Sequence, residues 1–107
     1  MNATTTALKA LFNSIPRRHS TDNVKEIYNI VSAYEDLLKI IEAENSFYEK
    51  NTPVFFDHLD NIKTLIKKST ENKASKKMKD HFFDEASGEL KDSMEQLTVL
   101  YSGKRDQ

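Results

Sequence analysis

The chain has 107 residues, a net charge of −1, two glycines, two prolines and no cysteine. This length suits one domain with one core, and the lack of cysteine excludes disulfide frameworks, thiol nucleophiles and Cys-ligated metals. Two glycines and two prolines are too few for the tight turns of a β-rich chain. We therefore expect an all-α fold over residues 1–107, a compact up-down helical bundle of three long helices plus a short N-terminal helix.

The first predicted helix covers about residues 3–14. Its apolar side chains follow the i, i+3, i+4, i+7 spacing of one helix face, namely Leu8, Leu11, Phe12 and Ile15. Pro16 ends this helix, because the residue before a proline is pushed out of the helical region. Residues 1–20 also resemble a mitochondrial presequence, since the first acidic residue is Asp22. We expect a cytoplasmic protein and keep a targeting segment as the alternative.

The second predicted helix, about residues 22–50, is the longest and carries two apolar seams. The first seam consists of Val24, Ile27, Val31, Tyr34, Leu38, Ile41, Asn45 and Tyr48. The second seam consists of Ile30, Ala33, Leu37, Ile40, Glu44 and Phe47. Together the seams cover more than half of the helix circumference. A helix that is apolar over so wide an arc packs between two neighbours or keeps one face for a partner.

Two further helices follow, at about residues 53–69 and 76–101. Thr52 is the expected N-cap of the third helix, with Pro53 at its first position, where a missing amide hydrogen costs least. The apolar pattern lapses between these helices, which indicates a short turn. Gly88 lies inside the fourth helix and indicates a kink or a close contact with another helix. No run of about 18 apolar residues occurs, so we expect no membrane span.

Two of the three histidines, His58 and His81, are candidates for a metal or phosphotransfer site. If the third and fourth helices form a hairpin that turns near residue 72, His58 and His81 lie at roughly neighbouring levels. The Glu-x-x-His spacing of bundle metal sites is absent, and Asp57 and Asp60 would repel a phosphoryl group on His58. We therefore expect no metal and no cofactor, and keep a metal or phosphotransfer bundle as a third hypothesis.

A lysine-rich stretch joins the third and fourth helices. Its members are Lys67, Lys68, Lys73, Lys76, Lys77 and Lys79. Clustered cations bind nucleic-acid phosphates or anionic membranes, but this stretch holds no arginine and no interleaved aromatic residue. We interpret it as a solvated turn that complements the negative end of the preceding helix, with contact to an anionic partner as the alternative.

No catalytic motif emerges from the sequence. Gly-rich phosphate loops, a Gly-x-Ser-x-Gly elbow and His-Glu-x-x-His are absent, so we expect neither an enzyme nor a small-molecule substrate. The favoured function is a non-catalytic protein–protein interaction module, such as an inhibitor, an immunity-type factor, a chaperone or an adaptor. It would bind another protein, or a second copy as a homodimer, through Ile30, Leu37, Ile40, Glu44 and Phe47 of the second helix. The alternative is a small DNA-associated regulator that uses the lysine-rich stretch.

Overall fold

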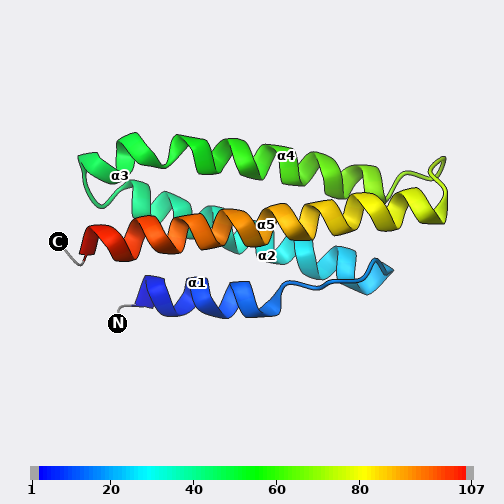
Figure 1. The fold of residues 1–107 in the computed structure, drawn as a ribbon, viewed down its shortest axis with the longest axis horizontal. Coiled ribbons are helices and arrows are strands. Elements are labelled where there is room, and N and C mark those ends of the chain that lie inside the picture. Colours follow the sequence, from blue (N-terminus) through cyan, green and yellow to red (C-terminus); the bar gives the residue numbers. More distant parts are fainter. Residues whose placement is uncertain (1–2, 106–107) are drawn as a thin grey trace.

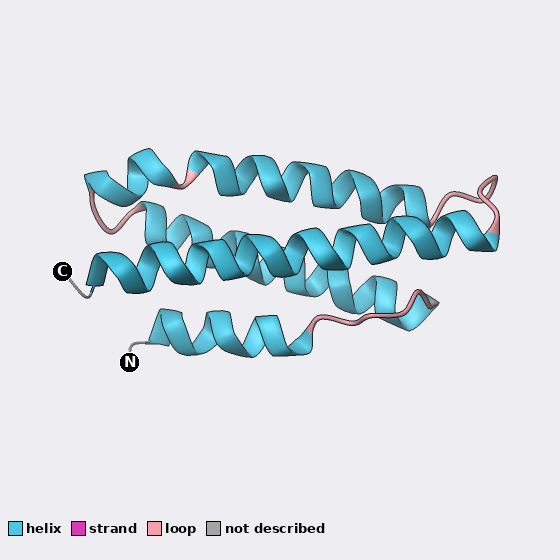
Figure 2. Cartoon of the chain, viewed as in Figure 1, coloured by secondary structure: helices cyan, strands magenta, loops and turns pink. Residues whose placement is uncertain are grey.

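Five helices make up the part of the chain that the structure describes. The structure is a computed structural model that describes the backbone of residues 3–105 and the side chains of residues 3–101. No strand occurs within these residues (Figure 2), so the expected all-α fold is confirmed. The helices are α1 (Ala3–Ser14), α2 (Thr21–Glu42), α3 (Ser46–Asn51), α4 (Pro53–Ser69) and α5 (Lys76–Arg105).

The four longer helices run alternately up and down along one axis (Figure 1). α1 packs beside α2 and α5, and α4 packs beside the same two helices, so that α2 and α5 are diagonal neighbours. The closest pair is α4 and α5, which the turn over residues 70–75 joins. Short α3 lies at one end, between α2 and α4 (Figure 1). The predicted up-down bundle is confirmed, and it measures 48 × 23 × 17 Å.

The core lies where the apolar stripes of the helices meet. The first seam of α2 is buried through Ile27, Val31, Tyr34, Leu38 and Ile41. From α4 the core receives Phe55, Leu59, Ile62 and Ile66, and from α5 it receives Phe83, Ala86, Leu90, Met94, Leu97 and Tyr101. Each fully buried large side chain contributes about 1.5–3 kcal/mol of hydrophobic free energy. These stripes, spaced three and four residues apart, therefore determine which face of each helix points inward.

The predicted helix over residues 22–50 is wrong beyond Glu42, where α2 ends. The cause is Asn45, whose backbone is extended and whose side-chain Oδ1 accepts a hydrogen bond of 3.0 Å from the Tyr48 amide. Asparagine favours this N-cap geometry over the helix interior, and α3 begins one residue later. The apolar spacing hid the break, because Tyr48 of α3 still enters the same core and is 2% exposed.

Thr52 does not cap α4 in the predicted way. Its backbone is helical, and its side-chain hydroxyl donates a hydrogen bond of 2.8 Å back to the Tyr48 carbonyl. Thr52 is fully buried, so its hydroxyl takes the nearest acceptor, which lies one turn earlier. The predicted position of Pro53, at the start of α4, is confirmed.

Gly88 marks neither a kink nor a close helix contact. α5 is one helix from Lys76 to Arg105, four residues longer than predicted, and Figure 1 shows it without a sharp bend. Gly88 is exposed, and a Cβ atom added there would meet no neighbouring atom within 4 Å. Its position on the outer face explains why no other helix depends on its small size.

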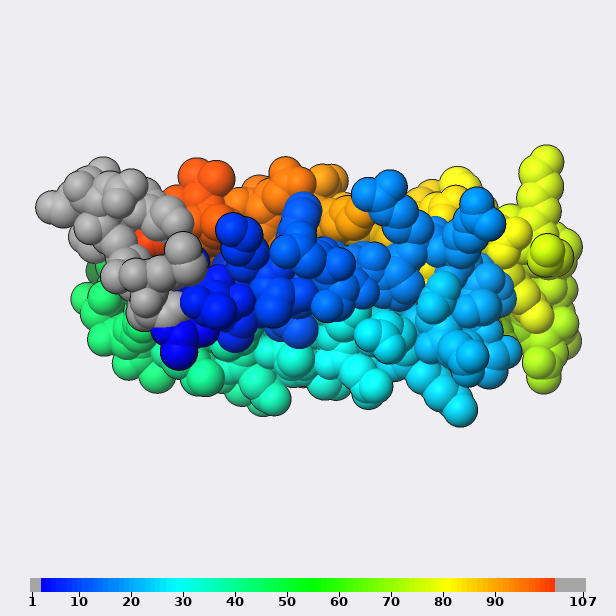
Figure 3. Space-filling view, turned by 90° about the horizontal axis from the view of Figure 1, so that it is seen from below, coloured from blue at the N-terminus to red at the C-terminus, as the bar shows by residue number. Residues whose placement is uncertain are grey.

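α1 covers only part of the bundle. It has 12 residues against 30 in α5, or about 18 Å against 45 Å at 1.5 Å per residue. Figure 3 shows α1 lying along the surface with α2 and α5 on either side, and the connector continuing its line. The connector is held by the Ser87 hydroxyl, which donates to the Pro16 carbonyl at 2.8 Å, and by the edge of His19 against Phe83.

Candidate functional site

The structure disperses the residues expected to form a partner face on the second helix, namely Ile30, Leu37, Ile40, Glu44 and Phe47. Ile30 is 4% exposed, and Leu37 and Phe47 are packed against the core. Ile40 is 53% exposed. The Glu44 carboxylate is exposed and accepts a hydrogen bond of 2.7 Å from the Tyr101 hydroxyl. Leu37 and Phe47 therefore do not form an open partner face, because both side chains pack against the core.

A groove with largely apolar walls lies between α1 and α5. It has a volume of about 480 Å³ and is lined by Thr5, Lys9, Phe12, Glu95, Thr98 and Val99. The groove exists because α1 approaches α5 less closely than α4 does. Val99 is 72% exposed, the highest value among the exposed large hydrophobic residues, and Phe12 is only partly buried. Sequence reasoning missed this groove, because it depends on how far α1 stands from α5.

A buried chain of hydrogen bonds links three helices. The Tyr34 hydroxyl of α2 and the Ser93 hydroxyl of α5 are 2.8 Å apart, and Ser93 Oγ lies 3.0 Å from His58 Nδ1 of α4. Tyr34 is fully buried and Ser93 is 1% exposed. One serine hydroxyl thus satisfies polar groups from both neighbouring helices, which fixes their register. Sequence analysis placed Tyr34 on an apolar seam but gave Ser93 no role.

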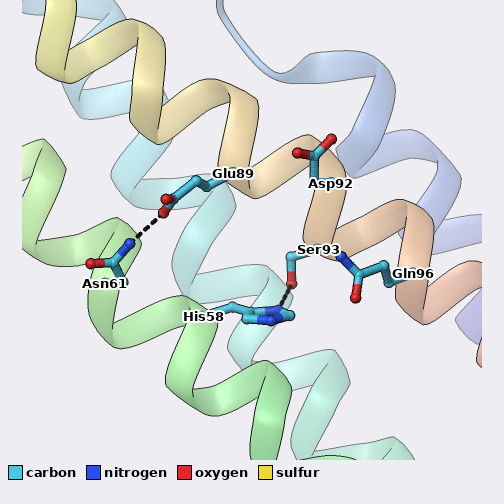
Figure 4. A pocket seen from close by; sticks show the side chains of 6 residues that line it. All are labelled: His58, Asn61, Glu89, Asp92, Ser93 and Gln96. Carbon is cyan, nitrogen blue, oxygen red and sulfur yellow. Dashed lines mark hydrogen bonds between the residues drawn. The ribbon is translucent and has the colours of Figure 1, made fainter.

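The outer end of this chain of hydrogen bonds opens into a shallow pocket between α4 and α5 (Figure 4). Its volume is about 230 Å³, and its lining is polar: His58, Asn61, Glu89, Asp92, Ser93 and Gln96. The Asn61 amide donates a hydrogen bond to the Glu89 carboxylate across the two helices. A serine beside a histidine is the basic unit of nucleophilic catalysis. Here, however, the Ser93 hydroxyl is buried and already shared between two partners, an arrangement that holds helices together.

Burial raises the pKa of the Tyr34 hydroxyl far above its usual range, and the hydrogen bond with Ser93 offsets only part of this increase. The cause is desolvation, which disfavours the charged phenolate. Tyr34 is therefore a neutral phenol at physiological pH. In this state it serves as a hydrogen-bonding group of the core and not as a base.

The two histidines considered for a metal or phosphotransfer site lie at different levels of the bundle. His58 faces Ser93, whereas the His81 Nε2 atom contacts Glu85 of its own helix at 2.7 Å. In the α4–α5 hairpin Ser93 lies opposite His58, and His81 lies 12 residues earlier in α5. The two histidines are therefore at different levels. Within the described residues, no three His, Cys, Asp or Glu side chains form a group that could hold a metal ion.

The lysine-rich stretch lies at the end of the bundle that contains the α4–α5 turn. Lys67, Lys68, Lys73, Lys76 and Lys77 are exposed, and Lys79 is partly buried. The Lys68 ammonium lies 5.6 Å from the centre of the Phe82 ring. The stretch is therefore a surface feature, as expected.

Comparisons with protein-family models, with curated proteins and with solved structures give no match to this chain. In the part of the chain that the structure describes, no helix combines the length and the hydropathy that crossing a bilayer requires.

Proposed function

We propose that this chain is a non-catalytic module that binds another protein, and that the groove between α1 and α5 receives an apolar side chain or helix of that partner. The observation that carries the proposal is the groove itself, with Phe12 partly buried and Val99 largely exposed beside it. An apolar groove between helices is the surface into which amphipathic partner helices dock. This surface replaces the second-helix face, of which Ile40 alone is an exposed apolar residue.

The geometry of α1 supports this proposal. Leu8 is the one buried residue of α1, and its other large apolar side chains, Leu11 and Phe12, are only partly buried. The apolar face of α1 is thus incompletely covered where Phe12 faces the groove beside α5. Lys9 and Glu95 stand among the groove's lining residues, so one cation and one anion flank the apolar surface. A polar rim around an apolar centre is the usual anatomy of a protein interface.

The test compares two exposed valines. Val99→Asp places a carboxylate in the groove, whereas Val54→Asp makes the same change at the start of α4, where Val54 is 51% exposed. Partners are captured on the wild type and on both variants from cells that express the chain, and are identified by mass spectrometry. We expect Val99→Asp to lose a partner that the wild type and Val54→Asp retain, with the melting temperatures of all three proteins close together.

Two results would contradict the proposal. The first is that the Val99→Asp protein retains every partner of the wild type. The second is a wild type that captures no partner. Sedimentation equilibrium shows whether the partner is a second copy of this chain or a different protein. If the wild type self-associates and Val99→Asp does not, the partner is this chain itself.

A further inference from the structure

The folded chain gathers cations at one end. Residues 16–27 and 64–85 form this end and contain nine basic and six acidic residues. We call the nine cations the basic end: Arg17, Arg18, Lys25, Lys67, Lys68, Lys73, Lys76, Lys77 and Lys79. The connector before α2 thus adds two arginines to the lysine-rich stretch. The arginines were not predictable as part of this cluster, because the two segments are about 50 residues apart in the chain.

Two hollows show that these segments are neighbours. Arg18 of the connector and Lys76 of α5 line one hollow, together with Asp80 and Asp84. Lys25 of α2 and Lys79 of α5 line another, of about 290 Å³, together with His19 of the connector and Ser69 at the end of α4. Cations from both segments therefore stand around the same surface.

The cations of the basic end have no ion-pair partners within 4 Å among the described residues. The nearby carboxylates of Asp80 and Glu85 instead contact His19 at 3.6 Å and His81 at 2.7 Å. Nine cations against six acidic residues leave this end with a net charge of +3, which an anionic ligand would offset. The exposed cations of the basic end, all but Lys79, are therefore accessible to a ligand.

The acidic remainder of the chain does not cancel this local charge. Residues 35–60, toward the opposite end, contain seven acidic and two basic residues. The bundle is 48 Å long, and charges interact over only about 10 Å at 0.1 M salt. A polyanion at the basic end therefore meets a local positive field, although the whole chain has a net charge of −1. Repulsion between the polyanion and the acidic residues at the opposite end would orient the molecule so that the basic end approaches the polyanion first.

We propose that the basic end binds the phosphate backbone of a nucleic-acid duplex, without reading its sequence. Lysine and arginine contacts to phosphates supply most non-specific affinity, and the forked guanidinium groups of Arg17 and Arg18 suit bidentate phosphate contacts. The bundle is 23 × 17 Å across its two shorter axes, wide enough to reach phosphates on both sides of a groove of about 12 Å. An anionic membrane fits less well, because Met78, 50% exposed, is the one strongly exposed apolar side chain beside the turn.

The experiment measures binding of the full chain to a fluorescent duplex of about 20 base pairs by anisotropy, between about 50 and 200 mM salt. With about five phosphate contacts, the logarithm of affinity should fall against the logarithm of salt concentration with a slope of about −4.5. R17Q/R18Q and K76Q/K77Q should each weaken binding about tenfold and make the slope shallower by about 1 to 2. K39Q/K50Q removes the same charge from exposed positions outside the basic end and should bind like the wild type.

Three outcomes would overturn the proposal. They are no salt-dependent binding to the duplex, an equal loss in K39Q/K50Q, and binding to phosphatidylcholine–phosphatidylserine vesicles without binding to the duplex. Either double variant alone is sufficient for the test if the other fails to fold, which circular dichroism detects. The Val99→Asp protein should bind the duplex normally, so that failure of the groove proposal and failure of this proposal are distinguishable.

Discussion

Helices α2, α4 and α5 are held together differently from α1. The three long helices share a core of fully buried side chains, and the Tyr34–Ser93–His58 hydrogen bonds join them across the interior. Within α1, Leu8 is the one buried residue. Isolated helices of 12 residues are marginal in water. The comparison indicates that the three long helices hold the fold and that α1 is a cover which opens at lower free energy.

The largest expected effect comes from shortening one core side chain in the long helices and one in α1. Leu90 of α5 is fully buried, so Leu90→Ala should lower the free energy of unfolding of the whole chain by about 3 kcal/mol. Leu8→Ala should instead act locally and speed amide exchange within residues 3–14. Urea denaturation and hydrogen exchange measure the two effects. Global destabilisation by Leu8→Ala as large as that by Leu90→Ala would show that α1 is an integral part of the core.

The next effect tests the hydrogen bonds between the long helices. Ser93→Ala leaves the buried Tyr34 hydroxyl without its partner and should cost about 2 kcal/mol of unfolding free energy. The Tyr34→Phe/Ser93→Ala pair should cost less than the sum of the single changes. Ser87→Ala, which removes the bond to the connector, is the matched control and should cost about 1 kcal/mol or less. Additive costs for Tyr34 and Ser93 would show that their contact is energetically unimportant.

A smaller effect appears at alkaline pH. The unfolded chain ionises Tyr34 near pH 10, whereas the folded chain keeps the proton because burial raises the pKa of this group. Above about pH 10 the unfolded state therefore binds fewer protons, and the free energy of unfolding falls by up to about 1.4 kcal/mol per pH unit. Chemical denaturation from pH 9 to 11 should show a steeper loss in the wild type than in Tyr34→Phe. Parallel pH profiles would contradict the burial argument.

The smallest effect concerns the outer face of α5. Gly88→Ala should raise the free energy of unfolding by about 0.5–1 kcal/mol, because alanine favours the helix and the added methyl group meets no neighbour. Thermal denaturation measures the change. Destabilisation would reveal a contact at this position and would extend the tightly packed region to the outer face.

Much of the fold was predictable because apolar spacing reports which helix face is buried. The inward residues of α2 follow the first predicted seam, and Pro16 and Pro53 fall where helices were expected to end or begin. The break at Asn45 was not predictable from spacing, since the apolar pattern continues through it. A capping side chain competes with the helix interior through one local hydrogen bond, and that competition leaves the pattern of apolar residues unchanged.

The candidate sites were less predictable, because they depend on distances between helices. The groove at Val99 exists because α1 stands apart from α5, and the basic end because the connector folds back beside the turn. Ser93 gave one usable signal, a small polar residue beside Met94 in an otherwise apolar stripe. Its partners, Tyr34 and His58, lie 59 and 35 residues away along the chain, so one sequence alone does not identify them.

The alternating direction of the helices brings the start of α1 and the end of α5 to the same end of the bundle, opposite the basic end (Figure 1). An affinity tag or a fluorescent label attached to either terminus thus stands at the far side of a particle 48 Å long. A chain tethered to a sensor surface through a terminal tag would present its arginines and lysines outward to the solution. The groove at Val99, near the end of α5, would face the support more closely, so assays of the two surfaces require different attachment chemistry.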